Sequence, residues 1–238
     1  MKYKRILLKM SGEVLKGSQP NGIDQKTLLE FAGGIKELHD MGVEIGIVIG
    51  GGNFWRYRDN SWAGELAMDR VVSDTLGMIA TNMNILAFEW ALNAIGCPAK
   101  ALTAYPCGDS VEGYTVSKGL KYMKKGTVVL FGGGTGSPFF TTDSAAAMRA
   151  LEMECDVLMK ATKVDYVYDK DPEKNKDAKK FETLTYKEVI EKNLGVMDMT
   201  CAAILEEGKL PMLVFNLNTP GLIKKAVNGE KVGTIINS

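Results

Sequence analysis

The sequence predicts an α/β protein, built as a three-layer αβα sandwich around a mainly parallel central sheet. Short apolar runs alternate with longer segments of helical period along the whole chain. Several runs are apolar at successive positions, as in Val128-Val129-Leu130-Phe131, which is typical of strands covered on both faces. This alternation favours a parallel sheet between two helical layers. No internal repeat or linker interrupts it, so residues 1–238 are expected to form a single domain.

The predicted elements follow one another in a regular order. Apolar runs predict strands at residues 4–10, 43–50, 99–104, 127–132, 156–164 and 212–217. Segments of 3.6-residue period predict helices at residues 25–41, 69–95, 144–154, 186–193 and 220–227. Thr185 and Glu188 form a capping box at the start of the fourth helix, and Thr219 places an N-cap before Pro220 at the start of the fifth. Helix 69–95 is apolar on several sides, so part of it is expected to pack against a second subunit.

Composition excludes several classes of protein. Hydrophobic residues make up 45% of the chain and charged residues 24%, as in ordinary globular proteins. Lys+Arg and Asp+Glu both total 29, whereas a nucleic-acid-binding protein usually has a basic excess. The longest uncharged run, residues 126–142, is broken by glycines and Pro138, and a membrane span needs about 20 apolar residues. We therefore expect neither nucleic acid nor a membrane as a partner.

The numbers and spacing of cysteine and histidine indicate the cellular compartment and limit the possible kinds of active site. The four cysteines are scattered, which favours a reducing cytosol over a zinc site or a disulfide framework. The basic N-terminus is followed only by Ile6-Leu7-Leu8, too short for a secretory signal, so a cytoplasmic location is expected. The single histidine, His39, lies near a predicted helix end and argues against His-based metal sites and a Ser-His-Asp triad. We predict no protein-held metal.

Two glycine clusters point to phosphate binding. Gly50-Gly51-Gly52 and Gly132-Gly133-Gly134, the latter with Gly136, directly follow apolar strands. In open α/β sheets ligands bind beyond the carboxyl ends of strands, where glycine backbone can offer N–H groups to phosphate oxygens. The alternative is two tight turns without a ligand. Neither the P-loop nor the Rossmann glycine signature occurs.

Lys9 and Asp143 are the charged residues beside these turns. Lys9 comes at the end of the first strand, where it either clamps phosphate or is a core-edge lysine with its head in solvent. After the second glycine cluster, Thr141 and Thr142 precede a helix expected to begin near Asp143 or Ser144, and a helix N-terminus attracts anions. Asp143 is either the N-cap of this helix or an acid that orients a phosphoryl group or its metal ion.

Five segments together carry a recognisable pattern: Lys9-Met10-Ser11-Gly12-Glu13, Val48-Ile49-Gly50-Gly51-Gly52-Asn53, Asp69-Arg70-Val71-Val72-Ser73-Asp74, Gly134-Thr135-Gly136-Ser137-Pro138-Phe139-Phe140-Thr141-Thr142-Asp143-Ser144 and Lys160-Ala161-Thr162-Lys163-Val164-Asp165. They resemble the amino acid kinase family, and the resemblance covers essentially the whole chain. The third segment and residues 135–143 are similar to the bacterial branch of that family whose acceptor is UMP.

The resemblance implies an ATP-dependent kinase that converts UMP to UDP in pyrimidine nucleotide synthesis. It implies Mg²⁺ bound through the ATP phosphates, six identical subunits, activation by GTP and inhibition by UTP. The catalytic residues that it implies are Lys9, Arg56, Asp143 and Lys160. The implied ATP contacts are Lys9, Met10, Ser11, Gly12, Gly52, Arg56, Thr162, Tyr168 and Asp171. The implied UMP contacts are Gly51, Asp74, Thr135, Gly136, Ser137, Pro138, Phe139, Phe140, Thr141 and Thr142. The implied GTP region is Gly17, Ser18, Gln19, Pro20, Asn21 and Gly22, for which a plain connector is the alternative.

This residue set suits phosphoryl transfer, whose transition state spreads negative charge over the equatorial oxygens. Lys9, Lys160 and Arg56 supply positive charge, and a phosphate acceptor needs no strong general base. Two alternatives stay open. One is a family member with a carbamate, acetylglutamate or aspartate acceptor, against which Asp74 and residues 138–142 argue. The other is a non-catalytic nucleotide- or oxyanion-binding protein, against which the joint presence of Lys9, Asp143 and Lys160 argues.

Overall fold

The computed structural model describes residues 1–56, 68–217 and 221–238. Its helices are the 3-10 helix η1 (Gly12–Lys16), α1 (Gln25–Asp40), α2 (Arg70–Ala94), α3 (Val116–Lys124), α4 (Thr142–Glu152), α5 (Tyr186–Glu191), α6 (Met199–Glu207) and α7 (Leu222–Asn228). Its strands are β1 (Arg5–Met10), β2 (Glu44–Ile49), β3 (Ala99–Thr103), β4 (Glu112–Gly113), β5 (Val128–Gly132), β6 (Val157–Thr162), β7 (Val167–Tyr168), β8 (Lys180–Phe181), β9 (Thr183–Thr185), β10 (Met212–Asn216) and β11 (Thr234–Asn237).

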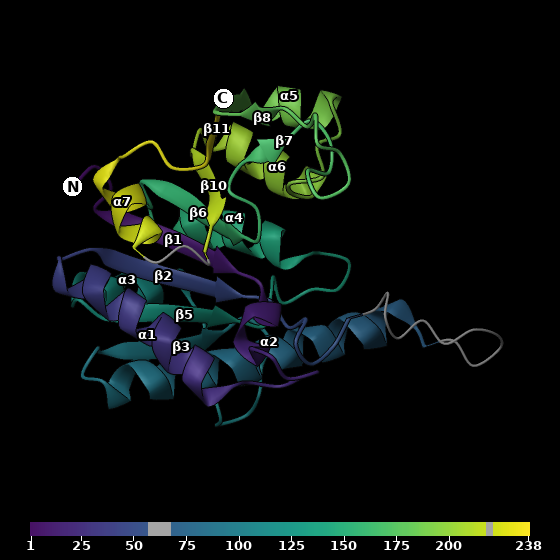
Figure 1. Cartoon of the computed structure of the whole chain (residues 1–238). Coiled ribbons are helices and arrows are strands. Elements are labelled where there is room, and N and C mark those ends of the chain that lie inside the picture. Colours follow the sequence, from purple (N-terminus) through teal and green to yellow (C-terminus); the bar gives the residue numbers. More distant parts are fainter. Residues whose placement is uncertain (57–67, 218–220) are drawn as a thin grey trace.

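Within the described residues, nine strands form one sheet in the order β4-β3-β5-β2-β1-β6-β10-β11-β9, and β7 pairs with β8 separately. Every pairing in the large sheet is parallel except that of β10 with β11. Figure 1 shows β1 in the middle, with β2, β5 and β3 on one side and β6 and β10 on the other. The predicted mainly parallel sheet is confirmed.

Side chains alternate between two hydrophobic cores, one on each face of the sheet. On β1, Ile6 and Leu8 enter the core formed with α1, α2 and α7, whereas Leu7 enters the core formed with α3, α4, α5 and α6. On β5, Leu130 and Val129 divide in the same way. Successive side chains of a strand point to opposite faces, so both faces are covered by helices. The three-layer arrangement expected from the sequence is therefore confirmed.

The predicted core elements all form, with ends shifted by at most a few residues. The capping box of Thr185 and Glu188 is present. The last helix begins at Leu222 rather than at residue 220, with Gly221 as its N-cap. Thr219 and Pro220 lie outside the described residues.

Helices η1, α3 and α6 and the short strands β4, β7, β8, β9 and β11 were not predicted. These elements are short, and most of them lack a long apolar run; α6, with the apolar run at residues 201–205, is the exception. In α3, for example, only Gly119 and Met123 are buried. Their conformation is set by packing against the larger elements, which a local pattern does not record.

Helix α2 combines a buried face with an uncovered apolar face. It is the one described helix long and apolar enough to cross a membrane, with a mean hydropathy of 1.2. However, Ile85, Phe88 and Leu92 are completely buried and belong to the core beneath α1, α2 and α7. We therefore interpret α2 as a core helix. Its exposed apolar residues are Val71, Val72, Ile79, Met83, Leu86 and Trp90.

Candidate active site

The carboxyl ends of β1, β2, β5 and β6 meet at one edge of the sheet, because these neighbouring strands are parallel. In the register of β1 and β6, Lys9 lies opposite Lys160. Both lysines therefore project toward the same face, the face covered by α4, and Asp143 lies in the first turn of that helix. Strand register thus places the two lysines together, and the packing of α4 against β1 and β6 adds Asp143.

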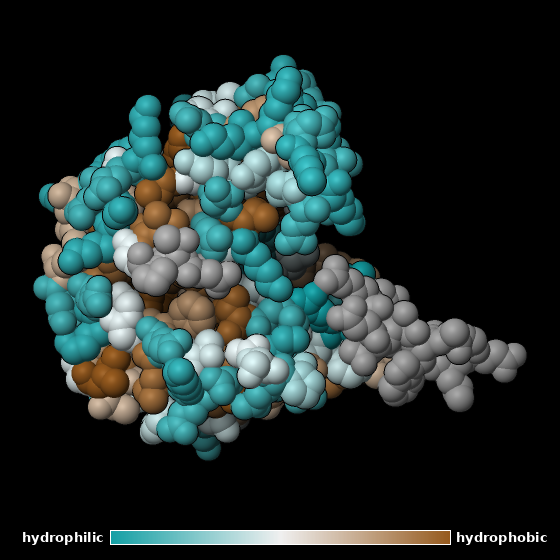
Figure 2. Space-filling model, in the orientation of Figure 1, coloured by the Kyte–Doolittle hydropathy of each residue, from teal (hydrophilic) through white to brown (hydrophobic). Residues whose placement is uncertain are grey.

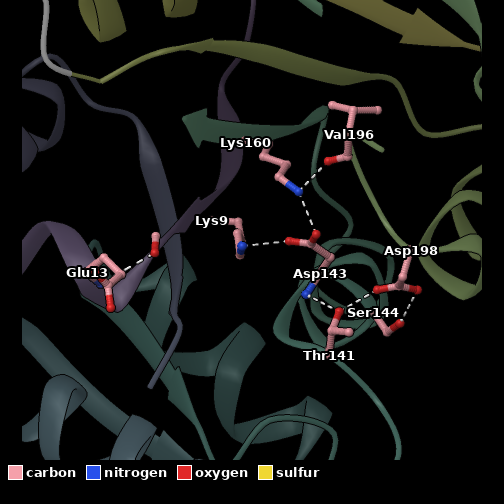
Figure 3. Close-up of polar contacts among 9 residues, drawn as sticks. Lys9, Glu13, Thr141, Asp143, Ser144, Lys160, Val196 and Asp198 are labelled. Carbon is pink, nitrogen blue, oxygen red and sulfur yellow. Dashed lines mark hydrogen bonds and ion pairs between the residues drawn. The ribbon is translucent and has the colours of Figure 1, made fainter. Parts of the chain in front are cut away.

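Asp143 lies between the two lysine head groups (Figure 3). Its Oδ1 is 2.6 Å from Lys9 Nζ, and its Oδ2 is 2.5 Å from Lys160 Nζ. Lys160 Nζ also donates to the carbonyl oxygen of Val196 at 2.5 Å. The carboxylate therefore holds two ammonium groups at the edge of the sheet.

Asp143 is not the N-cap of α4, contrary to one of the two sequence interpretations. Thr141 is the N-cap, and its Oγ1 accepts from the backbone N–H of Asp143 at 3.0 Å. The helix thus begins at Thr142 rather than at Ser144, and the Asp143 side chain faces the sheet. Its carboxylate is consequently available to both lysines.

Burial makes these charges interact strongly. The side chains of Lys9, Asp143 and Lys160 are 13%, 14% and 12% exposed. Burial alone would raise the pKa of Asp143, but the charges of Lys9 and Lys160 outweigh it and hold that pKa at about 2. Burial lowers the pKa of Lys160, an effect that Lys9 reinforces and Asp143 opposes. Two cations and one anion leave a net positive charge, which favours an anionic ligand.

A cavity of about 680 Å³ opens beside this cluster, between α2, the loop before α4 and the segment before α6. Of the residues predicted for UMP, Gly136, Pro138 and Phe139 do not line it. Those that line it are Gly51, Asp74, Thr135, Ser137, Phe140, Thr141 and Thr142, together with Lys9, Arg56 and Asp143. We name it the first cavity.

Asp74 connects α2 to the loop across the first cavity. Its carboxylate accepts from Arg70 Nε at 2.8 Å and, through Oδ2, from the backbone N–H of Phe139 at 2.8 Å. Phe139 has a φ of 71°, in the left-handed region that residues other than glycine rarely adopt. The strained loop is therefore fixed to α2 by a charged hydrogen bond.

A second cavity of about 540 Å³ lies on the other side of Lys160. Thr162, Tyr168 and Asp171, the predicted adenosine contacts, all line it. Tyr168 donates to Asp165 Oδ1 at 2.8 Å, and this bond raises the pKa of Tyr168. Gly195 lines both cavities, so they adjoin at the segment that also supplies Val196. The lysine cluster therefore lies between two adjoining cavities.

The other predicted ATP contacts lie at the turn after β1 or near it. The Met10 side chain is completely buried and lines neither cavity, so only its backbone remains available to a nucleotide. It lines a third cavity, of about 670 Å³, between η1, α1 and α7. On the face that carries α1 and α7, Figure 2 shows hydrophobic surface near the centre and hydrophilic surface around it.

Arg56 Nη2 is 3.1 Å from Glu13 Oε1, and the aromatic segment that follows Arg56, residues 57–62, lies outside the described residues.

The loop of residues 17–22, the predicted GTP region, folds back onto the turn after β2. Lys16 O accepts from the N–H of Gln19 at 3.0 Å, and the N–H of Gly22 donates to Asn53 O at 3.0 Å. Gly17 has a φ of 56° and ends η1. The loop is therefore anchored at both ends rather than extended.

Sequence analysis missed Asp198, which lines the first cavity. As the N-cap of α6, it accepts from the N–H of Cys201 at 2.8 Å. It also accepts from the hydroxyl groups of Thr141 and Ser144 (Figure 3). The cap spacing of Asp198 in the sequence could have predicted a helix start, but no local signal places that start beside α4. Trp55, Arg70 and Ser73 also line the first cavity. Arg70 and Ser73 belong to a segment that carries the family resemblance, but no contact was assigned to them or to Trp55.

Comparison with known proteins shows the family to which this chain is related. The profile of the amino acid kinase family matches residues 4–216. The chain belongs to the amino acid kinase family. Uridylate kinase of Bacteroides thetaiotaomicron is 47% identical over 237 residues, covering 100% of this chain and 99% of the relative.

Solved structures agree with this family membership. The UMP kinase structure from Bacillus anthracis has a TM-score of 0.94 at 36% identity and covers 100% of this amino acid kinase and 97% of that chain. The UMP kinase from Ureaplasma parvum has a TM-score of 0.92 at 36% identity, with complete coverage of both chains. The uridylate kinase from Archaeoglobus fulgidus has a TM-score of 0.74 at 29% identity and covers 97% and 99% of the two chains.

Proposed function

We propose that this amino acid kinase transfers the γ-phosphoryl group of ATP to UMP, producing ADP and UDP. The full-length similarity to uridylate kinases supports both substrates. The observation that carries the proposal is the cluster of Lys9, Asp143 and Lys160 between two adjoining cavities. A bisubstrate phosphotransferase needs positive charge where its two substrates meet.

The first cavity is assigned to UMP and the second to the adenosine of ATP. In the first, Asp74 would accept from a sugar hydroxyl. The nucleotide would be surrounded by Gly51, Thr135, Ser137, Phe140, Thr141 and Thr142. In the second, Tyr168 would offer an aromatic face and Asp171 hydrogen-bond acceptors. The ATP phosphates would extend along Lys9, Ser11, Gly12 and Gly52, with the Met10 backbone and Arg56 beside them.

In the reaction, an oxygen of the UMP phosphate attacks the γ-phosphorus of ATP. The bond from that phosphorus to the β–γ bridging oxygen breaks, and ADP leaves with the electron pair. Lys9 and Lys160 stabilise the negative charge on the transferring group. Asp143 acts by holding both lysines in place. Because the attacking oxygen is already ionised, no general base is required.

The side chains around the lysine cluster fit a Mg²⁺ ion that is bound mainly by the substrates. Among the residues described by the structure, no three Asp, Glu, His or Cys side chains are arranged to hold a metal ion. The Asp143 carboxylate is engaged by two lysines. Mg²⁺ usually keeps several waters and binds substrate phosphates. When bound, it would neutralise phosphate charge and help to align the phosphates.

The proposal includes a cytoplasmic homohexamer of single-domain subunits, activated by GTP through residues 17–22 and inhibited by UTP. The exposed apolar stripe of α2 supports assembly. Ile79, Met83, Leu86 and Trp90 recur at the spacing of one helix face and are 39%, 47%, 36% and 54% exposed. An uncovered stripe of this kind on a long helix favours packing against a second copy.

A coupled assay of ADP release tests the proposed reaction. ATP is supplied with UMP, CMP, carbamate or N-acetylglutamate as acceptor. We expect UMP to give the fastest turnover. Faster turnover with carbamate or N-acetylglutamate would assign the chain to another branch of the family, and no release with any acceptor would favour a non-catalytic binding protein.

A further inference from the structure

Two asparagines form a buried pair behind the turns assigned to the substrates. Asn53 is 2% exposed, and Asn84, on α2, is completely buried. The amide nitrogen of Asn53 donates to Asn84 Oδ1 at 2.9 Å, and that of Asn84 donates to Asn53 Oδ1 at 2.8 Å. Within the pair, each amide gives one hydrogen bond and receives one.

Each asparagine uses its remaining donor on a backbone carbonyl. Asn84 Nδ2 donates to Gly50 O at 2.8 Å, at the start of the glycine turn after β2. Asn53 Nδ2 donates to Gly22 O at 2.8 Å, in the loop before α1. The pair therefore joins α2, the glycine turn and this loop. Burying amides is costly unless they are hydrogen-bonded, and here all their donors are used.

The turn after β1 packs directly against the same groups. A Cβ atom on Gly12 would lie 2.1 Å from Gly50 O and 2.5 Å from Asn53 Oδ1. Only glycine can approach this closely without displacing the carbonyl. The backbone N–H of Gly50 also donates to Met10 O at 3.0 Å. The carbonyl that Asn84 orients is therefore the one on which the Gly12 turn rests.

We propose that Asn53 and Asn84 are positioning residues that set the separation of the donor and acceptor phosphates. They would do so by holding the turn of residues 50–52 against the Gly12 turn. This inference rests on the proposed placement of the substrates, with Gly51 on the UMP side and Gly12 and Gly52 on the ATP side. Neither asparagine lines the first or second cavity, so both act through backbone.

The test compares Asn53→Ala and Asn84→Ala with Asn93→Ala in the complete protein. Asn93 is a matched control because it lies on the same helix and makes three hydrogen bonds, to Glu89 and Ala99. Misplacing reacting groups by about 1 Å costs on the order of a hundredfold in rate. We expect kcat to fall about tenfold or more in both site variants. KM for ATP and UMP should change less than about threefold, because the other substrate contacts remain.

The double variant distinguishes an asparagine pair that acts as one unit from two residues that act independently. If the pair acts as one device, Asn53→Ala/Asn84→Ala should lose about as much kcat as the worse single variant. Asn93→Ala should lower the melting temperature but keep kcat. Should Asn84→Ala fail to fold, Asn84→Ser, which supplies a hydroxyl donor in place of the amide, should fold and show the same loss in kcat with nearly constant KM.

Three outcomes overturn the inference: kcat of the folded site variants within about twofold of wild type, a kcat loss equal to that of Asn93→Ala, or independent effects that multiply in the double variant. Failure of the wild-type protein to phosphorylate UMP would instead overturn the proposed function. Wild-type activity with unaffected site variants would overturn only the positioning role.

Discussion

Replacing Asp143 by Asn removes the negative charge between Lys9 and Lys160 and preserves the side-chain shape. In the wild-type protein each carboxylate oxygen faces one ammonium group, at 2.6 and 2.5 Å. In Asp143→Asn the amide nitrogen, which is a donor, would face one of the two lysines. The two head groups would then repel each other without compensation. We expect turnover to fall while the protein remains folded.

The distances set the size of the expected effect. At an effective dielectric constant of about 20, unit charges at these distances interact by about 6 kcal/mol. The cost of burying the charges offsets most of this. If about a quarter of the interaction with one lysine is lost in the transition state, the barrier rises by about 1.5 kcal/mol, or roughly tenfold in rate. The same loss for both lysines gives roughly a hundredfold.

Steady-state ADP release with ATP and UMP measures this effect, with Asp156→Asn as the matched control. Asp156 accepts from the backbone N–H groups of Lys4 and Arg5, at the opposite end of β1, so its kcat should stay unchanged. The pH profile adds a second readout. Asp143 raises the pKa of Lys160, so Asp143→Asn should move the alkaline loss of activity to lower pH. Unchanged turnover with normal UMP saturation would refute the electrostatic role of Asp143.

Four further predictions follow from the same geometry. The pKa of Asp143 is lowered to about 2, so its ionised carboxylate stabilises the fold above about pH 4. Between about pH 4 and pH 2, the free energy of unfolding measured with urea should fall by about 2 kcal/mol more in the wild type than in Asp143→Asn. Equal falls would contradict the ion cluster. Asp74→Asn should raise KM for UMP more than KM for ATP. A larger effect on ATP would reverse the assignment of the two substrates to the two cavities. We expect GMP not to be phosphorylated, because Phe140 and the glycine turn at Gly51 would confine the base site of the first cavity to a single ring; comparable rates with UMP and GMP would contradict this. Light scattering should show a hexamer, and kinetic measurements should show a turnover rate that rises with GTP and falls with UTP. A monomer whose rate responds to neither nucleotide would contradict both the assembly and its regulation. A hexamer whose rate does not respond to GTP would contradict only the role of residues 17–22.

Much of the fold was predictable because its signals are local. The continuous apolar runs of β1, β2, β5 and β6 indicate strands buried on both faces, and the structure confirms them. The capping box at Thr185 is a four-residue pattern that needs no tertiary contact to be recognised. Short elements such as α3 and β11 escaped prediction because their stability comes from packing on neighbours that are distant in sequence.

The site divides in the same way. Residues alone placed Lys9 at a strand end and Asp143 near a helix start, and the family resemblance added Lys160. Only the structure shows that strand register sets Lys9 opposite Lys160, with Asp143 between their head groups. The sequence left Asp143 with two interpretations, and the Thr141 cap decides between them.

The sequence by itself determined the layered α/β architecture, the glycine turns at strand ends and the residue types available for phosphate chemistry. Tertiary structure alone decided which of these groups meet. Asp198 lies 57 residues from Thr141, and Asn53 lies 31 residues from Asn84, yet each pair is hydrogen-bonded. Capping and periodicity act over a few residues, whereas such contacts depend on how the strands and helices pack. Their partners therefore become visible only when the sheet and its helices are assembled.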